Sequence, residues 1–229
     1  MSFKKRSYEE ELMDDLESSG EVIEQTLKEL ETINRLLGGN QVTTNGLNLL
    51  VKNSEKLIIA DLGCGGGDML KLVAKWAKKK KLEVELIGFD ANPHIIEFAK
   101  QNCKEYPNIR FEVEDIFGED FKNRFFDIIL CTLFTHHFGD EQLTQIFKQF
   151  KKQSSIGVVI NDLHRHWLAY YSIKLLTQLF SKSEMVKYDG PLSVKRAFVR
   201  SDLQTILDRA GIKPLHLSWK WAFRWQLIF

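Results

Sequence analysis

Three glycines stand at alternate positions, Gly63, Gly65 and Gly67, directly after the apolar run 57–60 and before a segment with helical spacing of apolar residues, 69–77. Because glycine lacks a Cβ atom, such a turn can adopt positive φ angles and let a ligand approach the backbone closely. A strand, a glycine-rich turn and a helix in this order are typical of nucleotide binding. We therefore expect a nucleotide-containing ligand here; the alternative is a tight connection that binds nothing.

The spacing of this turn excludes two common nucleotide motifs. A dinucleotide fingerprint that starts at Gly63 needs glycine at position 68, where the chain has Asp68. A triphosphate-binding loop needs Lys followed by Ser or Thr after its glycines, and this pair is absent. We interpret Asp68 as an ordinary acid in the first turn of a helix, where it stabilises by about 0.3–1 kcal/mol.

An acidic residue at the end of a second strand could complete the site. Ligands of open α/β sheets bind at the carboxyl ends of the strands, and Asp90 closes the apolar segment 84–90. A carboxylate there can accept hydrogen bonds from both hydroxyls of a ribose, at about 1.5–3 kcal/mol each. The alternative role, capping the helix that begins at Pro93, suits Asn92 better by position. We therefore expect Asp90 to bind ribose.

The order of these landmarks resembles that of the class I S-adenosylmethionine-dependent methyltransferases. Asp61 precedes the glycines by two residues, as in the first motif of that family, and the resemblance extends over residues 57–162. It implies that S-adenosylmethionine is the cofactor and that Asp115, beside Ile116, lies near the adenine. The implied cofactor-binding residues are Asp61, Gly63, Gly65, Gly67, Asp90, Ala91, Asp115 and Ile116.

Two adjacent histidines, His136 and His137, follow the fourth expected strand, at the end of the sheet where the transferable methyl group should lie. A hydroxyl acceptor benefits from a base, but a phenol has a pKa of about 10 and histidine about 6.5, so complete proton transfer costs about 4.8 kcal/mol. Proton transfer concerted with methylation avoids most of this cost, and base assistance contributes about 10²–10⁴-fold. We expect one histidine to be the catalytic base and prefer His137. The alternative is that one packs against the cofactor and the other faces solvent.

A rival group, Asp162, His164 and His166, follows the fifth expected strand. If that strand continues, alternation places all three side chains on one side, as a base or a divalent-cation site. Metal-dependent methylation of catechols prefers oxygen-rich sites, and only one carboxylate is offered here. We therefore expect no metal.

Apolar strand-like runs alternate with helical patterns along most of the chain. The expected strands are 57–60, 84–90, 109–113, 125–133 and 157–160, with helices such as 69–77, 93–102 and 142–152 between them. This alternation predicts an α/β fold with a doubly wound, mostly parallel, Rossmann-like sheet that is covered on both faces. Residues 213–229 could fold back as an antiparallel edge pair, which gives seven strands as in the methyltransferase family.

Two segments lie outside this core. We divide the chain into an N-terminal helical cap at residues 1–50 and a methyltransferase core at 51–229, with a lid inserted at about 163–200. Residues 1–35 hold ten acidic and five basic residues, whereas 163–200 hold seven basic and two acidic ones. The opposite charges predict that cap and lid meet.

Composition limits the partners of the protein. Lys and Arg number 32 and Asp and Glu number 31, so a uniformly basic surface for nucleic acid is absent. The three cysteines lack C-x-x-C spacing, which argues against a disulfide framework and against a zinc site of that kind. No hydrophobic signal core follows the basic start and no run of 18 apolar residues occurs, so we expect a cytoplasmic protein.

Three further segments, 11–15, 33–39 and 189–198, resemble a bacterial methyltransferase group associated with phenolic-lipid and polyketide-derived ring synthesis. This resemblance implies a small-molecule acceptor that is methylated on a phenol or quinol hydroxyl. The Asp/Asn-Pro-Pro-Tyr segment of amino-methylating nucleic-acid enzymes and the Pro-Cys nucleophile of cytosine-5 enzymes are both absent.

Other functions stay open at this stage. They are methylation of a quinol ring carbon, methylation of protein or RNA with the basic lid as the binding surface, and S-adenosylmethionine binding without turnover. A peripheral membrane contact through Trp167, Tyr170 and Leu175 would suit a lipidic acceptor. The identity of the acceptor and the oligomeric state do not follow from the sequence.

Overall fold

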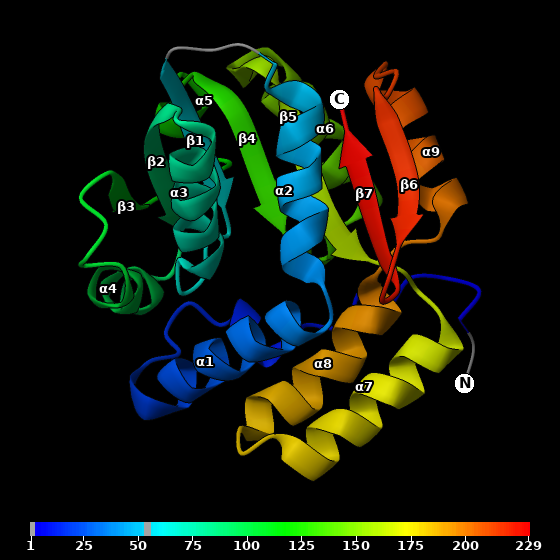
Figure 1. The fold of residues 1–229 in the computed structure, drawn as a ribbon. Helices are drawn as coiled ribbons and strands as arrows, with labels where there is room; N and C mark the ends of the chain where they lie inside the picture. Colours follow the sequence, from blue (N-terminus) through cyan, green and yellow to red (C-terminus); the bar gives the residue numbers. More distant parts are fainter. Residues whose placement is uncertain (1–2, 53–55) are drawn as a thin grey trace.

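A seven-stranded sheet forms the centre of the protein (Figure 1), as seen in a computed structural model that describes residues 3–52 and 56–229. The strands are β1 (Lys56–Leu62), β2 (Glu83–Asp90), β3 (Ile109–Val113), β4 (Phe126–Thr132), β5 (Ser154–Leu163), β6 (His216–Lys220) and β7 (Arg224–Ile228). Their order is β3-β2-β1-β4-β5-β7-β6. The first five pair in parallel, and β7 pairs antiparallel with β5 and β6. The predicted fold class is confirmed.

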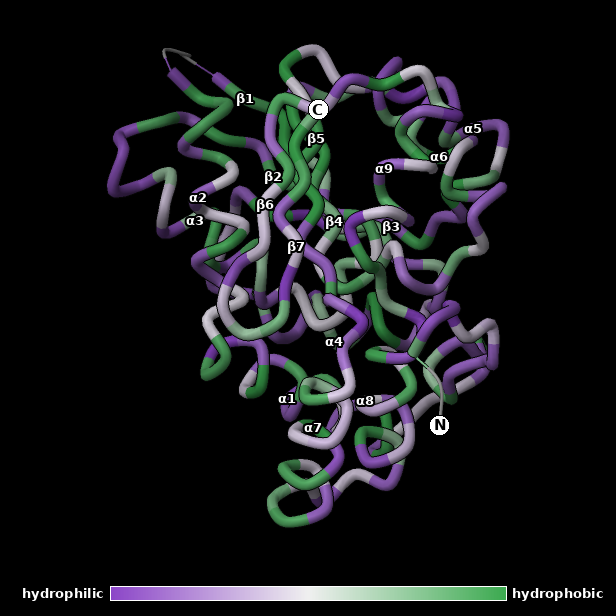
Figure 2. The backbone as a smooth tube through the Cα atoms, turned by 90° about the vertical axis from the view of Figure 1, so that its right-hand side faces the viewer, coloured by the Kyte–Doolittle hydropathy of each residue, from purple (hydrophilic) through white to green (hydrophobic). Residues whose placement is uncertain are grey.

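Helices cover both faces of the sheet. On one face lie α2 (Gly39–Leu50), α3 (Asp68–Lys80) and α4 (Pro93–Asn102), and on the other lie α5 (Glu119–Lys122), α6 (Asp140–Gln153) and α9 (Arg200–Ala210). In β4, Ile128 and Leu130 pack in the core on the side of α2, α3 and α4. The alternate residues Ile129 and Cys131 pack in the core on the side of α5, α6 and α9. Burial on both faces explains why this strand is an unbroken apolar run. In Figure 2 the central strands are correspondingly hydrophobic, while the helices alternate in hydropathy.

The remaining helices gather where the parallel strands end (Figure 1). From the N-terminal segment come the short helix η1 (Leu12–Asp14) and α1 (Gly20–Leu36). Between β5 and α9, the helices α7 (Trp167–Phe180) and α8 (Glu184–Arg196) form an antiparallel hairpin within the region expected to be a lid. The carboxyl end of the sheet is therefore covered from both sides.

Cap and lid are held together by ion pairs, as their opposite charges predict. Lys195 Nζ lies 3.0 Å from Glu9 Oε2, and Arg196 NH1 lies 2.7 Å from Asp14 Oδ2. The carboxylate of Asp189 in α8 also accepts backbone hydrogen bonds from the start of η1. The N-terminal segment is thus tied to the lid rather than to the sheet alone.

The two halves of the N-terminal region have different surroundings. Helix α2 packs closely on the sheet, because a Cβ atom on Gly46 would lie only 2.5 Å from Val159 of β5. Within the proposed cap at residues 1–50, η1 and α1 cover the strand ends, whereas α2 covers the sheet. The division of the chain at residue 50 stays a proposal.

Helix α7 does not present all of its aromatic residues to solvent. Tyr170 is only 7% exposed, and its ring centroid lies 5.5 Å from that of Phe3. The expectation that Tyr170 rests on a lipid surface is therefore wrong, since this side of α7 packs against the N-terminal segment.

Candidate active site

The turn between β1 and α3 needs glycine for two reasons. Gly63 and Gly67 have φ angles of 66° and 76°, in the left-handed region that favours glycine. A Cβ atom on Gly63 would lie 2.2 Å from the ring of Phe134, and one on Gly67 would lie 2.7 Å from that of Phe111. The turn is consequently packed tightly against neighbouring aromatic rings while its backbone lies at the strand ends.

Asp61 ends up buried beside this turn without a hydrogen-bond partner for Oδ1 in the described part of the chain. Burial, together with the nearby Asp68 and Asp90, raises the pKa of Asp61 well above its usual range. An unpartnered buried carboxylate is costly, and a bound cation offsets that cost. The cationic end of an S-adenosylmethionine molecule fits this requirement. Asp68, interpreted from sequence as an ordinary helix acid, lines with Asp61 the cavity between the glycine turn and the lid that is described below, and burial raises the pKa of Asp68.

Asp90 connects the glycine turn to the next loop. Its Oδ2 accepts the Gly65 N–H at 3.3 Å and its Oδ1 accepts the Asn92 N–H at 3.0 Å. The capping role falls to Asn92, whose Oδ1 accepts the N–H of His94 at 2.8 Å. Ala91 lies between the two. Burial raises the pKa of Asp90, although these amide hydrogen bonds oppose the rise.

Asp115 and Ile116 follow the end of β3. Asp115 is exposed and its Oδ1 accepts the Phe117 N–H at 2.9 Å, while Ile116 is 6% exposed and packs in the core. Neither lines the two cavities described next, and of the other expected cofactor residues Gly67, Asp90 and Ala91 do not line them either. Their contact with an adenine stays a prediction.

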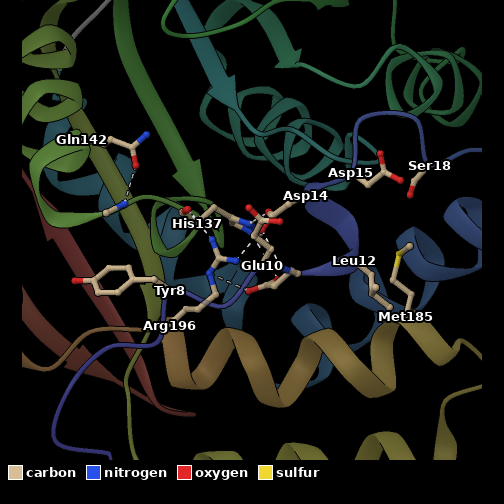
Figure 3. A pocket seen from close by; sticks show the side chains of 12 residues that line it. Tyr8, Glu10, Leu12, Asp14, Asp15, Ser18, His137, Gln142, Met185 and Arg196 are labelled. Carbon is tan, nitrogen blue, oxygen red and sulfur yellow. Dashed lines mark hydrogen bonds and ion pairs between the residues drawn. The ribbon is translucent and has the colours of Figure 1, made fainter.

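Two cavities meet at the N-terminal segment. One, of about 870 Å³, is lined mainly by residues 8–18 with His137, Gln142 and Arg196 (Figure 3). The other, of about 340 Å³, lies between the glycine turn and the lid. Glu11 and His137 line both cavities. The second cavity therefore joins the expected cofactor turn to the expected acceptor side.

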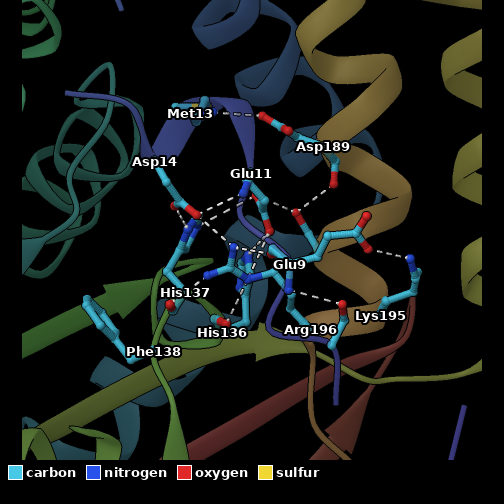
Figure 4. A network of polar contacts seen from close by, with 12 residues as sticks. Glu9, Glu11, Met13, Asp14, His136, His137, Phe138, Asp189, Lys195 and Arg196 are labelled. Atoms are coloured by element: carbon cyan, nitrogen blue, oxygen red, sulfur yellow. Dashed lines mark hydrogen bonds and ion pairs between the residues drawn. The ribbon is translucent and has the colours of Figure 1, made fainter. Parts of the chain in front are cut away.

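The two histidines are set on a strained turn after β4. Leu133 has a φ of 54°, unusual for a residue with a side chain, and the short helix η2 (Thr135–His137) follows it. Arg196 of the lid fastens this turn, because it donates hydrogen bonds to the backbone oxygens of His136 and His137 at 3.3 and 2.6 Å. Lid and histidine turn are thus one polar network (Figure 4).

Each histidine is paired with a carboxylate through Nδ1. His136 Nδ1 lies 2.7 Å from Asp162 Oδ1, and His137 Nδ1 lies 2.5 Å from Asp14 Oδ1. Burial would raise the pKa of Asp162, but His136 and a hydrogen bond from Thr135 hold it well below its usual range. Burial would also raise the pKa of Asp14, but the hydrogen bond and the charge of His137 outweigh this effect and hold that pKa below its usual range. With Nδ1 as the donor in both neutral rings, each Nε2 is left as the basic atom.

Both Nε2 atoms face Glu11. His136 Nε2 lies 3.6 Å from Glu11 Oε1, and His137 Nε2 lies 3.9 Å from Oε2. Burial raises the pKa of Glu11 to about 7, although His137 and Arg196 oppose this. Sequence reasoning gave Glu11 no catalytic role. The sequence pointed to Glu11 only through segment 11–15, which resembles the bacterial methyltransferase group described above.

The rival group on β5 is not assembled, so that hypothesis is wrong. The strand ends at Leu163, so the alternation does not continue. Asp162 turns to His136, whereas His164 Nδ1 accepts a hydrogen bond from Trp219 at 3.1 Å, and His166 caps α7. The histidines of this group belong to an aromatic cluster with Phe223.

The fold and the glycine turn are typical of α/β enzymes that bind a nucleotide-containing ligand. Comparison with known proteins gives the family. The chain belongs to the methyltransferase-domain family, whose model matches residues 53–211. It is an S-adenosylmethionine-dependent methyltransferase.

Individual relatives are distant. Carboxy-S-adenosyl-L-methionine synthase of Helicobacter pylori is 23% identical over 186 residues, which cover 76% of this chain and 74% of the relative. Ubiquinone biosynthesis O-methyltransferase of Bartonella quintana is 28% identical over 177 residues, covering 72% and 68%.

Solved structures support the fold. Human N-acetylserotonin methyltransferase, in complex with S-adenosylmethionine, aligns with a TM-score of 0.64 at 18% identity, over 97% of this chain and 59% of that one. Magnesium protoporphyrin IX methyltransferase from Synechocystis, with bound S-adenosylhomocysteine, aligns with a TM-score of 0.56 at 19% identity, over 83% of this chain and 82% of that one.

Within the residues the structure describes, none of the helices combines the length and apolar character needed to cross a membrane.

Proposed function

We propose that this enzyme methylates a hydroxyl oxygen of a small aromatic or lipidic molecule. The observation that carries the proposal is the pair of carboxylate-bound histidines, which line the cavity that also contains the glycine turn. Such a pair suits the activation of a hydroxyl group beside the cofactor.

The chemistry asks little of the protein beyond position and proton removal. S-adenosylmethionine supplies an already electrophilic methyl group when bound. The residues of the chain align the acceptor, exclude water and receive the hydroxyl proton. Nε2 of His136 or His137 is the simplest acceptor for that proton, because Asp162 and Asp14 stabilise the imidazolium that results.

The second cavity has the walls of a binding site for an apolar ring. The lid contributes apolar side chains and also polar ones, and the turn between β6 and β7 adds an aromatic ring. The apolar lid residues are Leu163, Ala169, Ile173, Leu176 and Val194, the polar ones include Ser172, Thr177, Asp189 and Ser193, and the ring is that of Phe223. Pockets of this composition use few polar groups to fix the orientation of a ligand. We infer an aromatic acceptor whose ring lies against the lid and whose hydroxyl lies against the histidines.

A buried arginine in the same cavity adds a requirement. Arg224 is 2% exposed, and its Nε has no hydrogen-bond partner among the residues described. NH1 donates to Asn161 at 3.3 Å, and burial lowers the pKa of Arg224 to about 10. A buried cation of this kind favours an anionic or strongly accepting group on the ligand. We therefore propose that the acceptor carries a carboxylate or a second oxygen function.

We expect a lipidic acceptor to enter this cavity beside α7. One side of this helix lines the cavity at Ala169 and Ile173, while the other exposes Trp167, Leu175 and Phe180 to 55%, 60% and 77%. A helix with an apolar face outward suits the surface of a lipid bilayer. We propose a peripheral membrane contact here. Co-sedimentation with anionic liposomes, lost on a Leu175→Ser/Phe180→Ser double substitution and kept with Leu215→Ser, tests it; equal sedimentation of both variants rejects it.

The function is tested by incubating the enzyme with S-adenosylmethionine and a panel of phenols, hydroxybenzoates and quinols. Release of S-adenosylhomocysteine and a product heavier by one methyl group are expected, but not from the same acceptors with the hydroxyl already methylated. His136→Gln and His137→Gln should slow transfer by about 10²–10⁴-fold, whereas the exposed His94→Gln should not.

Each alternative function gives a different result in this assay. Methylation of hydroxyl-blocked quinols indicates transfer to ring carbon. Label that enters only protein or RNA fractions indicates a macromolecular acceptor. Cofactor binding with no S-adenosylhomocysteine from any acceptor indicates a binding protein.

A further inference from the structure

We propose that Glu11, His136 and His137 bind a divalent transition-metal ion, for which Zn²⁺ is the best match. The role given to that ion, holding the acceptor oxygen, rests on the proposed function; the metal site itself does not. Both the distances and the chemistry of the three side chains carry the proposal.

The three side chains offer converging ligand atoms. One nitrogen from each histidine and one carboxylate oxygen lie within 4.8 Å of one another. The closest approaches to Glu11 are 3.6 Å from His136 Nε2 and 3.9 Å from His137 Nε2. Zinc bonds of about 2.0–2.2 Å in tetrahedral geometry place ligands roughly 3.4 Å apart. The two approaches are to different oxygens of Glu11, so the side chains must move inward, by up to about 1.4 Å, for one oxygen and two nitrogens to close around an ion.

Two of these atoms lack a hydrogen-bond partner. His136 Nε2 and Glu11 Oε1 are buried and form no hydrogen bond within the described residues. Their side chains are 3% and 4% exposed. Buried polar atoms without partners are rare and costly. A metal ion between them satisfies both at once.

The hydrogen-bond partners of the two histidines are of the kind that metal-bound histidines usually have. Such histidines usually donate the second ring N–H to a carboxylate or carbonyl, which fixes the ring and raises its basicity. Asp162 and Asp14 occupy these positions for His136 and His137. Glu11 is fixed in turn by Ser193, whose hydroxyl donates to Oε2 at 2.9 Å.

The charges of the cluster favour a dication. Glu11, Asp14 and Asp162 contribute three carboxylates in direct contact with the histidines, and Arg196 is the cation that touches them. Arg196 Nε lies 3.6 Å from Glu11 Oε1, but its hydrogen bonds go to Asp14 and to backbone oxygens. Arg196 can balance only one of these carboxylates, and Arg224 interacts with Asp162. When Glu11 is ionised, a divalent ion would balance the negative charge that is left beside the histidines.

The ligand set points to zinc rather than to magnesium or calcium. Two imidazoles and one carboxylate suit borderline metals such as Zn²⁺ and Co²⁺, whereas Mg²⁺ and Ca²⁺ prefer oxygen alone. Three protein ligands leave an open position, as in catalytic zinc sites. The expectation of no metal considered only cysteines and the carboxylate-poor group on β5. It did not include Glu11, which comes from the opposite end of the chain.

An ion here would change how the histidines act. They hold the ion, and the ion lowers the pKa of the acceptor hydroxyl that occupies its open position. The O–H bond breaks as the oxygen–metal bond forms, and the proton passes to water. The O–CH₃ bond then forms as the S–CH₃ bond breaks, releasing S-adenosylhomocysteine.

The test is a Co²⁺ titration of the full-length protein after dialysis against EDTA, without any acceptor. One Co²⁺ per chain with visible absorption of four- or five-coordinate geometry is expected. Glu11→Gln and His137→Gln should each weaken binding at least about 100-fold. Glu17→Gln and His94→Gln, both exposed, are the matched controls and should bind as the wild type does.

Unfolding is separated from ligand loss by measuring S-adenosylhomocysteine affinity and thermal unfolding of each variant. Wild-type protein without Co²⁺ absorption, or a folded Glu11→Gln variant with unchanged Co²⁺ affinity, overturns the proposal. Because no acceptor is present, neither outcome depends on whether the proposed methylation occurs.

Discussion

His136 Nδ1 lies 2.7 Å from Asp162 Oδ1, a contact that joins the turn after β4 to the end of the adjacent strand β5. Asp162 also accepts the Thr135 hydroxyl at 2.6 Å and the His136 N–H at 3.1 Å. One buried carboxylate thus fixes both the ring and the backbone of the turn. Nε2 of His136 is consequently directed toward Glu11.

Asp162→Asn is expected to disturb the tautomer and orientation of His136 without removing its ring. We expect a fall in kcat of about 10²–10⁴-fold with little change in KM for the acceptor or in cofactor affinity. Steady-state kinetics and calorimetric titration of S-adenosylhomocysteine measure both effects. The exposed Asp208→Asn is the control. An unchanged kcat in folded Asp162→Asn protein rejects the role of this pair.

Asp61→Asn should stabilise the cofactor-free protein. Burial, with Asp68 and Asp90, raises the pKa of Asp61 in the folded state, so folding favours its protonated form. The destabilisation is absent below the unfolded pKa of about 3.9 and grows as the pH rises toward the folded value. We expect a gain of about 1 kcal/mol or more for Asp61→Asn at pH 8 and a smaller one at pH 5, measured by urea unfolding.

The same property predicts how cofactor affinity depends on pH. A cationic ligand binds best to the ionised carboxylate, so S-adenosylmethionine affinity should increase as the pH rises through the raised pKa of Asp61. The increase should be much smaller in Asp61→Asn. Calorimetric titrations between pH 5 and 9 measure it; identical pH profiles for the two proteins contradict a direct contact between Asp61 and the cofactor.

Asp90 is expected to contribute to cofactor binding in proportion to its hydrogen bonds. Loss of a charge-assisted bond to ribose in Asp90→Asn should weaken S-adenosylhomocysteine binding roughly 10- to 150-fold, from about 1.5–3 kcal/mol. Asp90→Ala also removes the contacts to Gly65 and Asn92 and should abolish binding. The exposed Asp120→Asn serves for comparison. Wild-type affinity in Asp90→Asn removes Asp90 from the cofactor site.

Arg196 and Lys195 offer a matched pair for testing how the lid is held. Arg196 is buried and its partners include Asp14, so Arg196→Met should destabilise the fold by about 3–5 kcal/mol. Lys195 pairs with an exposed Glu9, and Lys195→Met should cost about 0–1 kcal/mol. Denaturant unfolding and limited proteolysis of the lid measure the difference. Equal effects of the two substitutions would show that Arg196 does not hold the histidine turn.

Local patterns in the sequence predicted the cofactor side of the site. The glycines from Gly63 to Gly67 and the apolar runs carry their information within a few residues, through backbone freedom and two-sided burial. The antiparallel C-terminal pair also followed, since residues 213–229 alternate with a turn between them.

The catalytic side depends on contacts between distant segments. Glu11 reaches His136 only because η1 lies across the strand ends, and no periodicity encodes that placement. Asp162 was recognised as a residue of chemical interest, but its partner was taken from its own strand rather than from the turn after β4. Tyr170 looked like a surface aromatic until the packing of Phe3 was known.

The most direct test of the account is the fate of a ¹³C-labelled methyl group from S-adenosylmethionine with a phenolic acceptor, followed by NMR. The account predicts a new O–CH₃ signal from the wild type, lost when Glu11, His136 and His137 are replaced together while cofactor binding persists. A methyl signal on ring carbon, or an O–CH₃ signal formed at the wild-type rate by that triple variant, would contradict it.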